Sequence, residues 1–230
     1  MTRYRPRTEG LFARIVHHHD AENDYWQVQS KDGLTSLYGT KRPANAGPDW
    51  EDPAIVADPD NRDKVFAWKL TETKDPFGNR IVYEYDRDSG QLQEHHWDQL
   101  YLRRIQYIDY TDGNGQERFL VSVTFEYEEL PDRYEEEVPA TRRIYPFSDY
   151  RAGFEIRTRR RCRCIKIRTH AAEVCDDIDE GCLVRTYKLV YLDQRADLEN
   201  LQDLLPLNGV SLLSQMVVVG HDGDATESLP

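Results

Sequence analysis

The sequence predicts an all-β protein built as an antiparallel meander of hairpins. Three observations lead to this fold class. Apolar and polar residues alternate along several segments, Asp-Gly and Asn-Gly turns separate these segments, and helical spacing occurs in one short stretch only. The 230 residues suffice for one large β domain or two small ones. Since no change in composition marks a boundary, we expect one continuous domain over residues 1–230.

The clearest strand is expected at residues 117–127, ERFLVSVTFEY. Every second residue there, from Phe119 to Tyr127, is apolar, which is the pattern of a half-buried strand. Residues 64–72 and 183–191 alternate in the same way, and a longer strand is expected over 153–169. Shorter strands are expected at residues 11–16, 24–29, 34–38, 81–85, 101–108 and 212–219.

Turn signals lie between these strands, and Asp-Gly and Asn-Gly supply the positive φ that tight hairpins need. We expect reversals at residues 31–33, 75–79, 86–90 and 112–115. Residues 40–63 and 129–149 are rich in Pro or in charge and are interpreted as longer loops. A short helix is expected within residues 195–205, where Leu198, Leu201 and Leu205 have helical spacing.

The charge of the chain excludes two classes of partner. Its 42 acidic and 30 basic residues give a net charge of −12, whereas nucleic acids and anionic membranes attract a positive surface. No apolar run approaches the roughly 20 residues of a membrane helix. The N-terminal stretch lacks the apolar segment of a Sec signal peptide. We therefore expect no nucleic-acid partner, no membrane insertion and no Sec signal in this chain.

The four cysteines do not form a familiar zinc pattern. Cys162 and Cys164 make a C-x-C pair, expected on one face of a strand, and no further Cys or His completes a site. We expect reduced thiols, while a bridge between Cys175 and Cys182 stays open as an alternative.

Consecutive histidines at His17, His18 and His19 raise the question of a metal site. Adjacent residues of a strand point to opposite faces, so three in a row cannot converge on one ion. Because they follow the expected strand at 11–16, we interpret them as part of a solvated loop. The pair His95-His96 is interpreted in the same way.

No catalytic motif stands out. Glu135 to Glu137 contains the Glu-x-Glu pattern of ADP-ribosyltransferase sites, but it carries little weight in so acidic a chain and no Ser-Thr-Ser strand lies nearby. A nucleophile elbow, a P-loop and a dinucleotide-binding glycine motif are absent from the sequence. We therefore predict no catalytic residue, no cofactor and no metal ligand.

One segment, residues 157–168, is strongly basic. On a strand, Arg157, Arg159, Arg161 and Arg163 would share a face. A nucleic-acid surface is conceivable, but aromatic residues for base stacking are not interleaved. Ion pairs with acidic neighbouring strands are the expected role.

The order of several blocks resembles a known family. The blocks YRPRTEGLFARI, YW, DGLTSLYG, VFAWKLTETKDPFGNRIVYEYD, YLRRIQY, FLVSVTFEY, FSDYRAGFEIRTRRRCRCI, CLVRTYKLVY and GVSLLSQMVVVGHDG follow one another along nearly the whole chain. In this order they resemble the SpvB-type domain of virulence-plasmid B proteins. That domain begins the B component of insecticidal toxin complexes. The D-x-x-G-N turn at Asp75 to Asn79 also resembles that of Rhs/YD repeats.

The resemblance implies a segment of a large Rhs/YD-type β shell, which B and C components build around a toxic C-terminal region. It implies a non-catalytic role in a secreted toxin complex that is made in the cytoplasm. The implied partners are other parts of the B and C subunits and the translocation channel of the A component. The Gly-rich opening segment and a following strand of the family are absent, so a partial domain is expected.

The alternative from the residues themselves is a free-standing secreted β module. It would bind protein or carbohydrate through surface aromatic residues such as Trp50 and Trp97.

Overall fold

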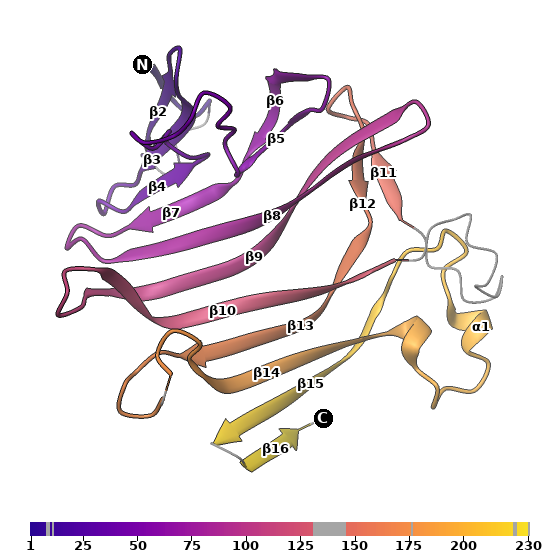
Figure 1. The fold of residues 1–230 in the computed structure, drawn as a ribbon. Coiled ribbons are helices and arrows are strands. Elements are labelled where there is room, and N and C mark those ends of the chain that lie inside the picture. Colours follow the sequence, from indigo (N-terminus) through magenta and orange to yellow (C-terminus); the bar gives the residue numbers. More distant parts are fainter. Residues whose placement is uncertain (8–9, 11, 131–145, 176, 223–224, 230) are drawn as a thin grey trace. The chain divides into compact units, whose positions relative to one another are not determined.

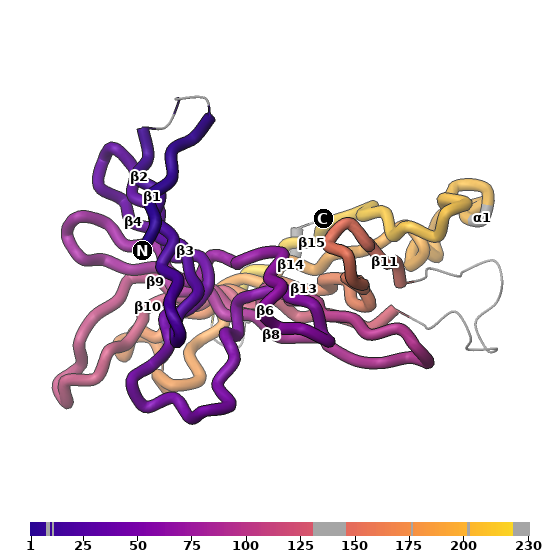
Figure 2. The backbone as a smooth tube through the Cα atoms, turned by 90° about the horizontal axis from the view of Figure 1, so that it is seen from above, coloured from indigo at the N-terminus to yellow at the C-terminus, as the bar shows by residue number. Residues whose placement is uncertain are grey.

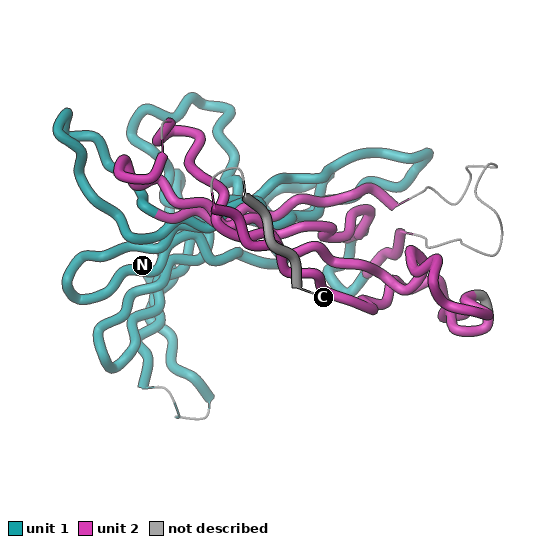
Figure 3. Tube along the Cα trace, turned by 90° about the horizontal axis from the view of Figure 1, so that it is seen from below, with its two compact units in different colours: residues 1–120, 150–155 teal, residues 121–149, 156–230 magenta. Residues whose placement is uncertain are grey.

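The computed structural model describes residues 1–7, 10, 12–130, 146–175, 177–222 and 225–229. Nearly all regular structure is antiparallel β-strand, so the predicted fold class is confirmed (Figure 1). The chain divides into two compact units (Figure 3). Residues 1–120 with 150–155 form the first unit, and residues 121–149 with 156–230 form the second.

The first unit contains a series of neighbouring antiparallel strands. In hydrogen-bonding order they are β1 (Thr2–Tyr4), β2 (Arg14–His19), β3 (Asp24–Gln29), β4 (Thr35–Tyr38), β7 (Leu70–Lys74), β8 (Arg80–Leu92) and β9 (His95–Thr111). Figure 2 shows β1 to β4 gathered at the indigo end of the chain. β5 (Ile55–Asp58) and β6 (Asn61–Trp68) form a separate two-stranded sheet.

The second unit continues in the same style. β10 (Glu117–Glu129) contributes its residues from Val121 onward and pairs with β13 (Arg160–Thr169). β14 (Cys182–Tyr191), β15 (Leu213–Asp222) and β16 (Ala225–Leu229) follow in order. β11 (Phe147–Asp149) and β12 (Ile156–Thr158) form their own small sheet. Among the described residues, helical structure consists of a 3₁₀ turn, η2 (Leu192–Gln194), and of α1 (Leu201–Leu204), which is shorter than the predicted segment.

Three of the predicted turns are confirmed, and their aspartates explain them. Asp75 Oδ1 accepts hydrogen bonds from the main-chain N–H groups of Phe77 and Asn79, both at 2.9 Å, and Gly78 has a φ of +101°. Asp112 accepts equivalent bonds from Asn114 and Gln116. Such side-chain bonds let an aspartate organise its own reversal. The turn at 31–33, with Gly33 at +89°, completes the set.

The turn predicted at residues 86–90 is wrong. β8 runs straight through this stretch to Leu92, and the chain reverses at Gln93 and Glu94. The charged residues that suggested a turn are used inside the structure. Arg87 forms an ion pair with Asp98 on the facing strand, and Gly90 lies opposite Trp97.

Two predicted strands are each divided by a single residue. Lys69 separates β6 from β7, because its N–H donates to Ala54 and its carbonyl accepts from Gly39. Arg159 separates β12 from β13 and accepts a bond from Leu130 N. In each case the two halves pair with different strands. The segment 40–63, interpreted as a loop, contains β5 and the start of β6.

Six strand pairs carry register shifts. In five of them a single shift leaves one residue over, which is a β-bulge, while the β5–β6 pair carries two shifts. In the pair β8–β9, Glu84 faces Arg104 while Tyr85 faces Leu102, so one residue of β9 has no direct partner position. Equivalent shifts occur in β4–β7, β10–β13, β13–β14 and β14–β15. The residues left over are Thr71, Arg103, Arg163, Val184 and Ser214.

The core of the first unit surrounds a carboxylate. Asp98 has no exposed surface and lies among buried residues that include Val56 and Trp97. Its oxygens accept bonds from Arg87 Nη1 at 2.6 and 2.7 Å, from Arg62 Nη1 at 2.7 Å and from Ala57 N at 2.9 Å. Arg87 also donates to the carbonyls of Asp52 and Ile55. These bonds connect the β8–β9 hairpin to the β5–β6 sheet.

We expect Asp98→Ala to destabilise the protein by about 3–5 kcal/mol, because it leaves two half-buried arginines without their shared carboxylate. The measurement is equilibrium unfolding in urea. Asp86→Ala on β8 is the matched control, since the Asp86–Arg103 pair is exposed and 3.6 Å apart. That control should cost less than about 1 kcal/mol. Equal effects of the two substitutions would contradict the central role of Asp98.

Gly90→Ala tests the close packing of the β8–β9 hairpin. A methyl group at this position would overlap the indole ring of Trp97, which is 6% exposed. Overpacking of this kind costs roughly 1–3 kcal/mol. Gly113→Ala is the control, because no atom lies within 4 Å of its added carbon. It should change the free energy of unfolding by less than about 0.5 kcal/mol. A neutral Gly90→Ala would show that the ring can move away freely.

Candidate functional site

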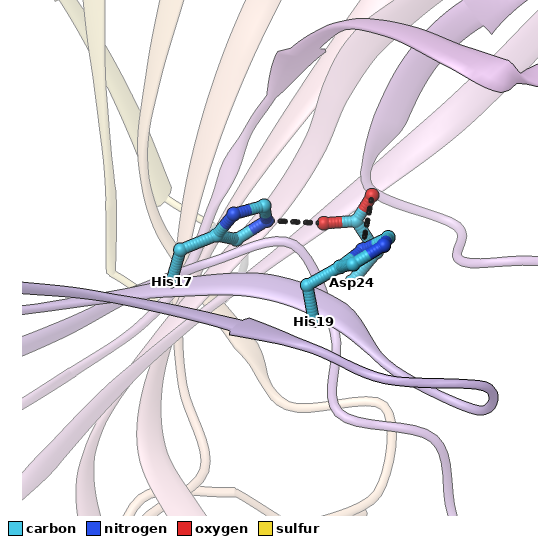
Figure 4. A group of neighbouring side chains, drawn as sticks. All are labelled: His17, His19 and Asp24. Carbon is cyan, nitrogen blue, oxygen red and sulfur yellow. Dashed lines mark hydrogen bonds and ion pairs between the residues drawn. The ribbon is translucent and has the colours of Figure 1, made fainter. Parts of the chain in front are cut away.

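The hairpin of β2 and β3 brings two histidines and an aspartate together (Figure 4). The three histidines 17–19 belong to β2, so their interpretation as a loop is wrong. Alternation along the strand separates His18 from the other two, and His17 and His19 share a face. The turn at Asp20 to Asn23 sets the register that places His19 opposite Asp24.

The distances within this cluster are short. His17 Nε2 donates to Asp24 Oδ1 at 2.5 Å, and His19 Nδ1 lies 3.6 Å from Asp24 Oδ2. One nitrogen from each histidine and one carboxylate oxygen all lie within 4.8 Å of one another. The exposed fractions of the side chains are 17% for His17, 67% for His19 and 33% for Asp24. The described residues therefore contain one group with ligand types and spacing suited to a metal ion.

Aromatic rings hold this cluster in place. The Trp26 ring stacks on His17, with centroids 4.1 Å apart and planes at 4°. The Trp68 ring meets both of them edge-on, each at 5.8 Å. Trp68 Nε1 also donates to the main-chain carbonyl of Asp24 at 2.9 Å. His17 and Asp24 are thus fixed by packing and by hydrogen bonds.

His18 makes its contacts on the other face of β2. Its ring stacks on Tyr25 at 4.6 Å, and its Nε2 donates to Gln27 Oε1 at 3.1 Å. It takes no part in the cluster.

A groove of about 650 Å³ opens beside the cluster and is lined in part by His19 and Asp24. Acidic residues dominate the rest of its charged lining, with two arginines among them: Asp20, Glu22, Arg42, Glu51, Asp52, Arg62 and Asp63. Burial raises the pKa of Asp52, although the main-chain N–H groups of Thr40 and Ala54 donate to its carboxylate. Trp50 also lines this groove.

A serine–histidine pair occurs in the second unit. Ser122 Oγ lies 2.8 Å from His170 Nε2, and His170 Nδ1 donates to the carbonyl of Ile178 at 2.8 Å. In a hydrolase the histidine orients and activates an accessible serine. Ser122 is only 3% exposed and lies on the β10–β13 ladder, so a substrate cannot reach its hydroxyl. The pair instead supplies hydrogen-bond partners for the Ser122 hydroxyl and for the Ile178 carbonyl.

All four cysteines are free thiols in the structure. The bulge at Arg163 places Cys162 opposite Tyr127 and Cys164 opposite Glu126, so the expectation that they share a face is wrong. Burial raises the pKa of both thiols, which disfavours the thiolate that nucleophiles and metal ligands require. Cys182 N donates to Cys175 Sγ at 3.0 Å, so these two residues are neighbours.

The basic segment is paired with acidic neighbours, as predicted. Arg161 donates to Glu128 at 2.5 Å and to both oxygens of Asp193 at 2.7 and 2.9 Å. Burial opposes the charge of Arg161, but these two carboxylates outweigh it and raise its pKa. Lys166 and Arg163 both contact Glu126, and the Lys166 bond lowers the pKa of that carboxyl. The four arginines were expected to share one face of a single strand. The strand is broken at Arg159 and bulged at Arg163, so the regular alternation that this expectation assumed is lost.

Of the remaining residues considered from the sequence, those that the structure describes do not join the histidine cluster. His95 and His96 begin β9, so their interpretation as a loop is wrong, and His96 Nδ1 donates to Asp60 Oδ1 at 2.5 Å. Trp97 is buried, so it cannot serve as a surface-binding aromatic residue. Glu135 and Glu137 lie outside the described residues. Of the helices that the structure describes, none has the length and apolar character needed to cross a membrane.

Sequence reasoning missed the cluster because it ended the first strand at Val16. The available signal was His-x-His in a strand, followed by a short turn and an aspartate at position 24. Correct strand bounds would have placed all three on one face of a hairpin.

Comparison with known proteins gives consistent results. Mono(ADP-ribosyl)transferase SpvB from Salmonella typhimurium strain 14028s is 25% identical over 204 residues, covering 78% of this chain. The protein of the same name from Salmonella choleraesuis gives the same values. The match covers 33% of each relative, so the chain corresponds to about a third of their length.

Two solved structures share the fold. The N-terminal domain of effector protein SpvB from Salmonella typhimurium has a TM-score of 0.68 at 24% identity, over 96% of this chain and 69% of that one. The TcdB2-TccC3 complex without its hypervariable C-terminal region has a TM-score of 0.69 at 25% identity, over 99% of this chain and 11% of that one.

The family model of the Salmonella virulence plasmid 65kDa B protein, SpvB, matches residues 1–170, which is more than half of the chain. The expected resemblance is thereby confirmed, and the chain belongs to the SpvB family.

Proposed function

We propose that this chain is a non-catalytic structural segment of a toxin-complex B component and helps to form a hollow β shell around a toxic C-terminal region. The observation that carries the proposal is the match to TcdB2-TccC3. It aligns 99% of this chain with 11% of a far larger chain, at a TM-score of 0.69. The chain thus resembles one part of a larger assembly.

The strands themselves support a structural role. In the described part of the chain, β1 and β16 stand at the two ends of the strand order, each with one hydrogen-bonded neighbour. An edge strand presents main-chain N–H and C=O groups to which a further strand can add. Large apolar side chains are also exposed in the second unit, among them Leu213 at 57% and Met216 at 48%. Both features suit a segment that other parts of a subunit cover.

The comparisons also support the absence of catalysis in this segment. The solved SpvB structure that it matches is the N-terminal domain of that effector. The transferase name belongs to relatives about three times as long as the matched region. We propose that residues 1–230 are part of a domain and that any enzymatic activity resides elsewhere.

The partners follow from the same proposal. They are other parts of the B and C subunits and the translocation channel of an A component, within a secreted toxin complex. A matched solved structure is a complex of TcdB2 with TccC3, which supports partners of this class. A free-standing module that binds protein or carbohydrate is the competing function, and burial of Trp97 removes one of its expected contacts.

Light scattering of the purified chain over a range of concentrations, combined with thermal unfolding, tests the shell role. We expect association that increases with concentration and a broad unfolding transition, because edge strands and apolar surface stay uncovered. A monomer with one sharp transition would contradict the proposal and favour the free-standing module.

Transfer of labelled ADP-ribose from NAD tests the non-catalytic role. We expect no labelling of the chain or of added protein acceptors. Labelling that disappears in Glu135→Gln or Glu137→Gln, but persists in the matched variant Glu136→Gln, would establish an enzymatic function and overturn this part of the proposal.

A further inference from the structure

We propose that His17, His19 and Asp24 form a binding site for a divalent transition-metal ion, and that Zn²⁺ is the ion that this ligand set fits best. The site is independent of the structural role proposed above. It joins β2 to β3 next to the turn of their hairpin.

The donor types select the class of ion. Imidazole nitrogen together with a carboxylate suits Zn²⁺, whereas Mg²⁺ and Ca²⁺ prefer oxygen ligands only. Zinc sites with an exchangeable position commonly use three protein ligands, and two histidines with one carboxylate are a known combination. His17 Nε2, His19 Nδ1 and one Asp24 oxygen would supply these three ligands.

The spacing requires only small movements. Two ligand atoms bound to one tetrahedral zinc at about 2.0–2.1 Å lie about 3.3 Å apart. The observed distances involve different oxygens of Asp24, since His17 Nε2 lies 2.5 Å from Oδ1 and His19 Nδ1 lies 3.6 Å from Oδ2. With one ligand atom taken from each residue, the three atoms all lie within 4.8 Å of one another. The ion would replace the hydrogen bond between His17 and Asp24, and small rotations of the side chains would open the shorter distance and close the longer one.

Two of the ligands are already positioned without an ion. His17 is held by its stacking on Trp26, and the Asp24 main chain is held by the bond from Trp68 Nε1. Such preorganisation lowers the entropic cost of binding. His19 is the most exposed of the three at 67%, so the ion can enter from the solvent side.

The groove beside the cluster favours a cation. Five acidic residues line it besides Asp24, against two arginines, and a surface of one sign raises the local concentration of ions of the other sign. Three protein ligands leave a fourth position for water. Since His19 and Asp24 both line the groove, this position would face it.

The position of His19 distinguishes this proposal from a simpler explanation. The bond between His17 and Asp24 would exist as an ordinary cross-strand contact without any metal. A metal site additionally requires His19, which is exposed, lies 3.6 Å from Asp24 and makes a tilted ring contact with His17. The decisive variant is therefore His19→Ala, which removes one ligand from an exposed position and leaves the packed residues in place.

The experiment is calorimetric titration of the chelator-treated full chain with ZnCl₂, followed by titration with CoCl₂. We expect one equivalent of Zn²⁺ to bind. Visible absorption of the bound Co²⁺ should show the intense bands of four-coordinate geometry. Loss of an outer-shell partner alone weakens metal binding roughly 10–100-fold, so His19→Ala and Asp24→Asn should each weaken it at least about tenfold.

His18→Ala is the matched control, because His18 lies on the same strand but on the opposite face. It should leave the affinity unchanged, as should the double variant Cys175→Ser, Cys182→Ser. Circular dichroism checks that every variant is folded. The proposal is overturned if wild type binds no Zn²⁺, if His19→Ala binds as tightly as wild type, or if the loss occurs in the His18 or cysteine variants instead.

Discussion

A carboxylate that is buried away from water requires hydrogen-bond donors or positive charges around it, and the first unit is arranged around one such group. Asp98 receives bonds from two arginines and one main-chain N–H, and Arg87 carries further bonds to the carbonyls that precede and begin β5. Removal of one partner from a buried ion pair costs several kcal/mol, because a buried charge is left unpaired. The intact pair contributes little to stability when it is compared with well-packed apolar residues of similar volume. The network joins the β5–β6 sheet to the β8–β9 hairpin through bonds at several points.

The same logic explains why the histidine cluster forms where it does. The β2–β3 register places His17 opposite Trp26 and His19 opposite Asp24, and Trp68 then joins from β6. Each group satisfies another: a ring covers a ring, and a carboxylate receives an imidazole N–H. Residues with metal-binding spacing can thus come together through ordinary sheet packing. For this reason the effect of His19→Ala on metal affinity is the measurement that distinguishes the two explanations.

The sequence was sufficient for features that depend on local alternation and on turn chemistry. Asp24–Gln29 was predicted with its observed bounds, and the reversals at Asp75 and Asp112 followed from aspartates that bond to their own turns. It failed where non-local partners decide. Lys69 and Arg159 break strands through main-chain bonds to distant residues, and this leaves no trace in the alternation.

The candidate site was missed for the same reason. Consecutive histidines are polar and suggest solvent, but the tryptophans that bury His17 lie 9 and 51 positions away along the chain, at 26 and 68. The stretch 86–90 was predicted to be a turn but is part of a strand, where Ser89 lies opposite Asp98 and Arg87 forms an ion pair with it. A polar composition predicts an exposed segment on average. In these two segments, contacts with a few charged and aromatic residues determine how far the side chains are buried.

The β-bulges give the sheet a simple means of changing its curvature. A bulge bends its strand and increases the local right-handed twist. In this chain the extra residue is on the later strand of each bulged pair in the strand order, from Thr71 to Ser214. Gain or loss of a single residue at one of these positions would change the local bend of its strand while leaving the hairpin turns as they are.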